Sequence, residues 1–107
     1  MASSKQYLGF ILDQLSDLEE IAFRPMMGEY LLYYRGKLIG GIYDDRMLIK
    51  PAKAAERLLP HAPREVPYPG AKEMILITDP DDREGLEEIF REVYPELPEP
   101  KKKKTPH

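Results

Sequence analysis

Three apolar and aromatic runs separated by very short polar gaps constrain the fold more than any other feature of this 107-residue chain. The runs are Glu29–Tyr34, Lys37–Tyr43 and Met47–Ile49, and the gaps are Arg35-Gly36 and Asp44-Asp45-Arg46. Gaps of this length leave no room for a crossover helix, so consecutive strands have to be antiparallel. The sequence therefore predicts a three-stranded meander at the centre of the fold.

The first gap also predicts how two of these strands pair. A two-residue loop at Arg35-Gly36 places Tyr34 opposite Lys37. The same register continues along both strands and places Leu32 opposite Ile39. The paired glycines that follow Ile39 then face Leu31 and Tyr30, where a large neighbour fills the space or another backbone comes close.

An amphipathic helix is predicted before the meander. Ser3 and Ser4 are both suitable N-caps, and the helical pattern runs to about Leu18. Its apolar stripe consists of Tyr7, Leu8, Ile11, Leu12 and Leu15, with Phe10 beside it. A helix with one apolar stripe is expected to lie on a sheet.

Two further helices are predicted after the meander. A short one covers residues 51–59, with Pro51 at its first position, where the missing N–H costs nothing. A longer one is capped by Asp79 and has Pro80 at its first position. The apolar residues of the longer helix recur at helical spacing and are Leu86, Ile89, Phe90 and Val93.

Additional strands are predicted on either side of the meander. Ile21–Arg24 is a short strand that Pro25 confines to an edge or a strand end, because proline has no N–H to donate. Val66–Tyr68 is expected as an edge strand, turned back by Pro69-Gly70 onto Glu73–Ile77. The predicted class is therefore α+β, a two-layer sandwich of an antiparallel sheet with helices on one face.

Length and composition predict one domain, over residues 4–97, followed by a disordered Pro and Lys tail at residues 98–107. Lys101–Lys104 supply 4 of the 16 basic residues, so the rest of the chain has 12 against 19 acidic ones, a net charge of −7. An acidic body repels nucleic acid.

The chain has no Cys, which excludes thiol chemistry and agrees with a cytoplasmic location. No apolar run is long enough to cross a membrane.

The stretch from Gly28 through Lys50 resembles the N-terminal domain of the TfoX/Sxy family. Pro25-Met26-Met27-Gly28, and Val66-Pro67-Tyr68 followed by Met74, extend the likeness over residues 5 to about 94. The resemblance implies a fold similar to secretion chaperones and a role as a transcription co-regulator of competence genes, acting beside another regulator. Where family members typically carry Phe-Gly-Gly, this chain has Met27-Gly28-Glu29, and we expect these 107 residues to hold no counterpart of the family's C-terminal helical domain.

A partner-binding surface is the first candidate site. Alternation along a strand puts Tyr30 and Tyr34 on one face and Tyr33 on the other, so at least one aromatic ring escapes the helices. These tyrosines either pack within the sheet or form an exposed surface for a protein partner. The surface interpretation comprises Met26, Met27, Tyr30, Tyr33 and Tyr43.

A pocket is the second candidate site. Gly40 and Gly41 could admit a ligand beside the loop that carries His61, although a surface position is the simpler interpretation of a lone His. Asp44 and Asp45 could act in acid/base chemistry, but Asp is also common in turns. No catalytic, cofactor or metal motif is visible, and no Gly-rich phosphate loop occurs.

These observations support two functional hypotheses. The first is a non-enzymatic regulatory or protein-binding module, possibly homo-oligomeric, with a protein partner and no direct contact with nucleic acid or membrane. The alternative is a small-molecule-binding protein or minor enzyme with a pocket near Gly40, Gly41 and His61. The lysine tail is either a solubilising end or a contact with an anionic partner.

Overall fold

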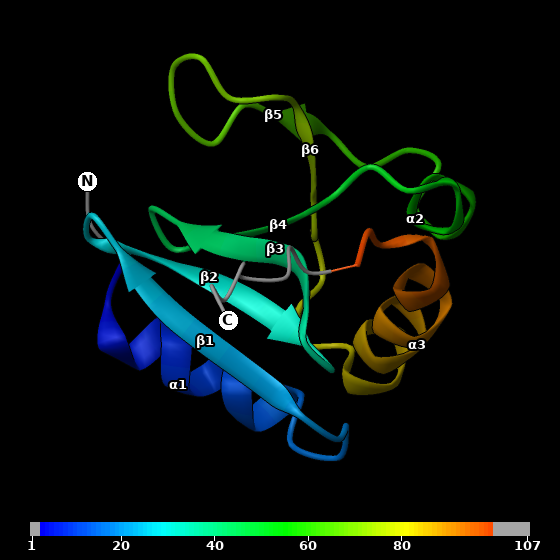
Figure 1. The fold of residues 1–107 in the computed structure, drawn as a ribbon, viewed down its shortest axis with the longest axis horizontal. Coiled ribbons are helices and arrows are strands. Elements are labelled where there is room, and N and C mark those ends of the chain that lie inside the picture. Colours follow the sequence, from blue (N-terminus) through cyan, green and yellow to red (C-terminus); the bar gives the residue numbers. More distant parts are fainter. Residues whose placement is uncertain (1–2, 100–107) are drawn as a thin grey trace, which may run out of the picture.

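Figure 1 shows the fold in a computed structural model, which describes residues 3–99. The elements in chain order are α1 (Lys5–Gln14), β1 (Ile21–Met26), β2 (Glu29–Tyr34), β3 (Lys37–Tyr43), β4 (Arg46–Ile49), α2 (Lys53–Leu58), β5 (Arg64–Glu65), β6 (Met74–Leu76), α3 (Arg83–Val93) and a 3-10 turn, η1 (Tyr94–Glu96). The strands form one sheet in the order β1-β2-β3-β4-β6-β5, and all neighbours are antiparallel. The predicted α+β class and antiparallel sheet are confirmed.

Three tight turns build the meander and its first edge. The residue pairs Met27-Gly28, Arg35-Gly36 and Asp44-Asp45 all have positive φ at both positions, between 51° and 85°. Two-residue hairpin loops of this kind match the right-handed twist of the strands. The predicted loops at Arg35-Gly36 and at Asp44-Asp45 are confirmed, and Arg46 belongs to β4 instead of the second gap.

The predicted register of β2 and β3 is correct next to the loop and wrong beyond it. Tyr34 pairs with Lys37, as predicted, but Leu32 pairs with Gly40 because Ile39 is an extra residue in a β-bulge. Simple alternation would send Ile39 and Ile42 to opposite faces of the sheet. The bulge reverses the alternation, and both side chains are fully buried in one core.

All three predicted helices start or end at different residues. Ser4 caps α1 by accepting from the Tyr7 N–H at 3.1 Å, but the helix ends at Gln14 and not at Leu18. The next residues form turns that still carry Leu15 and Leu18 into the core.

The sequence predicts Pro51 and Pro80 as first residues of helices, but both helices begin later. Residue Pro51 precedes α2, which starts at Lys53. Asp82 is the N-cap of α3 in place of Asp79, because its carboxylate accepts from the Gly85 N–H at 3.0 Å. A turn after Asp79 delays the helix by one turn, since the Asp82 N–H donates to the Asp79 carbonyl at 3.1 Å.

The prediction for the strands on either side of the meander was partly wrong. β1 is an edge strand that continues through Pro25, as an unpaired edge allows. Val66–Tyr68 is not a strand: β5 ends at Glu65, and Pro67 and Pro69 interrupt pairing in the loop that follows. Residues 100–107, most of the predicted tail, lie outside the described residues.

The core lies between the helices and one face of the sheet. Its fully buried residues include Ile11 of α1, Phe90 of α3 and Leu32 of β2, and it continues to Leu97. The opposite face, which carries Leu31 and Tyr33 and is called here the open face, has no helix packed on its centre. This asymmetry leaves the open face as the place to look for a site.

Candidate functional site

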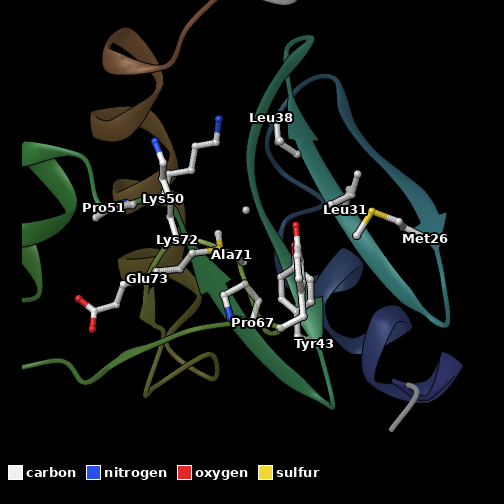
Figure 2. A pocket seen from close by; sticks show the side chains of 13 residues that line it. Met26, Leu31, Leu38, Tyr43, Lys50, Pro51, Pro67, Ala71, Lys72 and Glu73 are labelled. Carbon is white, nitrogen blue, oxygen red and sulfur yellow. The ribbon is translucent and has the colours of Figure 1, made fainter.

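A hollow of about 450 Å³ lies on the open face. Leu31 of β2 and Leu38 of β3 line it from the sheet, and the loop from Pro67 to Met74 forms the facing wall (Figure 2). Its volume lies within the range of small-ligand sites, roughly 300 to 1,000 Å³. The side chains around it are mostly apolar, with Lys50, Lys72 and Glu73 as the charged exceptions.

Two glycines of β3 allow the strands to lie this close. A side chain at Gly40 would collide with the β4 backbone, including the Ile49 Cα at 2.8 Å. A side chain at Gly41 would meet the ring of Tyr43 at 2.7 Å. Gly41 thus lets the Tyr43 ring lie against its own strand, where it is only 4% exposed and faces Tyr68, with ring centroids 6.2 Å apart.

A second hollow, of about 390 Å³, adjoins the first and shares Met26, Tyr43, Pro67 and Tyr68 with it. It is also lined by Met27, Glu29 and Pro69. Met27 is 96% exposed and Tyr68 is 50% exposed. The two hollows form one apolar surface that continues to the β1–β2 turn.

Lys50 is the partly buried one of the two lysines that line the larger hollow. It follows β4, and its backbone N–H donates to the Ile39 carbonyl at 2.9 Å. Burial lowers the pKa of the Lys50 ammonium group, and Lys50 forms no ion pair with any carboxylate in residues 3–99. The Glu73 carboxylate points away from the hollow (Figure 2). Burial also raises the pKa of Tyr43, with smaller contributions from Tyr68, Glu29 and Tyr33.

The structure brings together only part of the predicted partner surface. Met26 and Tyr43 line both hollows, and Met27 lines the smaller one. Tyr33 is on the open face but lies outside both, with the Arg24 guanidinium 5.8 Å from its ring centroid. Tyr30 is on the opposite face, where its ring lies 5.9 Å from Phe23 and packs against the core.

The predicted pocket residues are also separated. Gly40 lines the larger hollow, whereas Gly41 lies beneath the Tyr43 ring. His61 is exposed in the turn after α2 and lines neither hollow. The wall that faces Gly40 comes from residues 67–74 instead.

Sequence reasoning missed Lys50, Tyr68, Ala71 and Met74 as parts of one site. Lys50 had one signal, a charged residue directly after a buried strand and before Pro51. Tyr68 was assigned to a strand, and only the path of the loop places it over the sheet.

The turn at Asp44-Asp45 has a structural role. The Asp45 carboxylate accepts from the Ser4 N–H at 2.7 Å, and the Ser3 hydroxyl donates to Glu29 at 2.6 Å. These bonds attach the start of α1 to two hairpin turns.

Within residues 3–99, no three His, Cys, Asp or Glu side chains come together as metal ligands would. Nor does any helix in this range have the length and apolar character needed to span a bilayer.

Comparison with known proteins identifies a relative of similar length. No family model and no solved structure match the chain. The chain is 31% identical over 106 residues to the "uncharacterized 12.7 kDa protein in trpE 5′region" of Spirochaeta aurantia, and the match covers 98% of this chain and 92% of the relative. This extent of similarity shows that the chain belongs to the same family as the spirochaete protein.

Proposed function

We propose that this chain is a non-enzymatic protein-binding module whose partner docks on the open face of the sheet. The observation that supports this function is the grouping of exposed apolar side chains. Within residues 3–99, four large hydrophobic residues are exposed, and three of them, Met27, Val66 and Tyr68, belong to the two segments that flank the hollows. Exposed apolar groups gathered around a hollow are typical of interaction sites.

The chemistry of this surface suits an apolar protein segment. Met26 and Met27 are flexible and polarisable, so they can adapt to the shape of a partner. Tyr68, which is half exposed, adds aromatic area with a polar end, the combination enriched at protein interfaces. The resemblance to the TfoX/Sxy family suggests a transcription regulator in the cytoplasm as that partner, and this assignment is part of the proposal.

A second candidate function is favoured by the larger hollow itself. Its volume of about 450 Å³ and its apolar lining with few charged groups suit a small molecule. A protein segment and a small molecule would then use adjoining parts of one face.

A pull-down from nuclease-treated lysate of the source cell tests the first function. Wild type is compared with Tyr68→Ala and with Phe23→Ala, and bound proteins are identified by mass spectrometry. Phe23 is the matched control because it is 43% exposed, close to the 50% of Tyr68, but lies on the other face, opposite Leu32.

The expected result is one protein bound in stoichiometric amount by wild type and by Phe23→Ala, and lost from Tyr68→Ala. Equal retention by all three proteins would contradict docking on the open face. Equal loss from both variants would also contradict it, since the two substitutions change opposite faces.

A further inference from the structure

Lys50 leaves a positive charge without a partner at the edge of an apolar hollow. We infer that the larger hollow binds a small amphiphilic carboxylate, whose head pairs with Lys50 and whose apolar body lies on Leu31, Leu38 and Tyr43. This inference specifies the ligand class for the second candidate function, on which it rests.

The lining separates a charged edge from an apolar interior. Leu31, Leu38 and Met74 line the hollow with apolar side chains, Tyr43 adds its ring, and the small side chain of Ala71 leaves space between them. Lys50 and Lys72 both contribute to the lining, and the only acidic group beside them, Glu73, is turned outward (Figure 2). A ligand in the hollow therefore meets an apolar surface at one end and positive charge at the other.

The environment of Lys50 favours a negatively charged ligand. Removal of water from the ammonium group disfavours its charged form, which is why the Lys50 pKa is lowered. Two arginines of the helices do have carboxylate partners: Arg57 of α2 contacts Glu92 and Arg91 of α3 contacts Glu87, at 3.1 and 3.8 Å. A bound carboxylate would give Lys50 the partner that the described residues do not supply, and would raise its pKa again.

The number of charges favours a monocarboxylate over a phosphate. Lys50 is the partly buried cation of the lining, and Lys72 is exposed. Phosphate sites usually combine several backbone N–H donors from a Gly-rich loop or a helix N-terminus. Gly70, the glycine that precedes Ala71 and Lys72 in the loop, does not line the hollow and so supplies no such donor. The apolar body can be aliphatic or aromatic, since the lining offers both kinds of side chain.

Titration calorimetry with two pairs of probes tests the inference on the full chain. Octanoate and 3-phenylpropanoate are the carboxylates, and octan-1-ol and 3-phenylpropan-1-ol are their uncharged counterparts. The proteins are wild type, Lys50→Met, Lys50→Arg, and Lys5→Met as the control, because Lys5 is an exposed lysine of α1 on the other side of the sheet.

At least one carboxylate should bind wild type more tightly than its alcohol. Lys50→Met should weaken that carboxylate by about tenfold to a hundredfold, the value of one hydrogen bond to a charged group, and should leave the alcohol unchanged. Lys50→Arg should retain most of the affinity, and Lys5→Met all of it. Whether octanoate or 3-phenylpropanoate binds identifies the body of the ligand.

Three results would overturn the inference. If each alcohol binds as tightly as its carboxylate, or if Lys50→Met leaves the carboxylate affinity unchanged, the hollow binds small molecules without selecting an anion. If neither carboxylate binds wild type, the small-molecule function fails as well, while the pull-down result for the protein partner is unaffected. Ala71→Phe, which narrows the hollow without changing its charge, should abolish binding and so locate it there.

Discussion

The two faces of the sheet differ in how deeply their side chains are buried. On β2, Leu32 and Tyr34 face the helices and are 0% and 7% exposed, whereas Leu31 and Tyr33 face the other way and stay partly exposed. All four residues are apolar or aromatic, so their chemistry does not explain the difference. What differs is the cover: helices pack closely on one face, and a proline-containing loop spans the other at a distance. The covering element therefore decides whether apolar strand residues are buried in the core or stay partly exposed.

Lys50 also differs from two arginines of α3 in its ion pairing. Around the helices, Arg83 lies near Asp17 and Glu87, and Arg91 pairs with Glu87 as well. On the open face, Lys50 has no such partner among the described residues. Lys50 thus differs from these two arginines in having no carboxylate beside it to balance its charge.

The largest effect that separates the faces is expected for Phe90→Ala. Phe90 is fully buried between α3 and the sheet and contacts Tyr34, with ring centroids 5.9 Å apart. Removal of this ring should lower the free energy of unfolding by about 3 to 5 kcal/mol. Urea denaturation followed by circular dichroism measures the change. Tyr68→Ala, on the open face, should cost less than about 1 kcal/mol, and equal losses would break the comparison.

A smaller effect tests how the helix-covered face is assembled. Asp82→Ala removes the carboxylate that caps α3 at the Gly85 N–H, and should cost about 1 kcal/mol. Asp79→Ala is the matched control, because its carboxylate does not cap the helix. Thermal unfolding of the two variants should show a lower melting temperature for Asp82→Ala alone. The reverse order would mean that α3 starts at the first acidic residue, as predicted from the sequence.

The smallest effect concerns the charge on the open face. Burial lowers the Lys50 pKa below its ordinary value of 10.5, so the folded state binds this proton more weakly than the unfolded state. The resulting loss of stability is fully present below the lowered pKa and disappears as the pH rises past 10.5.

Lys50→Met should therefore stabilise the protein at neutral pH, by less than about 1 kcal/mol because the ammonium group is only partly buried. Urea denaturation from pH 7 to 11 should show the difference from wild type shrinking at the alkaline end. Subtraction of wild type from variant cancels the titration of the tyrosines. A difference that stays constant with pH would show that the ammonium group is fully hydrated.

Much of the fold could be predicted from the sequence, because it depends on residues that are close together in the chain. The loop at Arg35-Gly36 and the cap of α1 depend on a few neighbouring residues: the loop is predicted correctly, and Ser4 is one of the two predicted caps. The start of α3 was missed because Asp79 and Asp82 are chemically equal candidates, and the choice depends on which carboxylate meets a free N–H. The end of α1 was missed because Leu15 and Leu18 stay buried whether or not the helix continues to them.

Less of the candidate site could be predicted, because its residues come from segments that are far apart in the sequence. Met26 and Tyr43 were selected from their residue types and do line the hollows. Tyr30 was selected for the same reason and lies on the opposite face. Lys50 and Ala71 were not selected, since no local pattern indicates that a loop after β5 crosses over the end of β4.

The meander and the amphipathic helices follow from the sequence itself, because each depends on turn chemistry or on a repeat within one segment, whereas Pro25 left an edge or a strand end open for β1. Tertiary structure alone decided the bulge at Ile39 and the hollow beside Lys50. The bulge allows the side chains of both Ile39 and Ile42 to pack in the same core. The hollow results from the path of the loop after β5, whose prolines prevent the loop from pairing with the sheet as a strand. Both are settled by contacts between segments far apart in the chain, which no local pattern can encode.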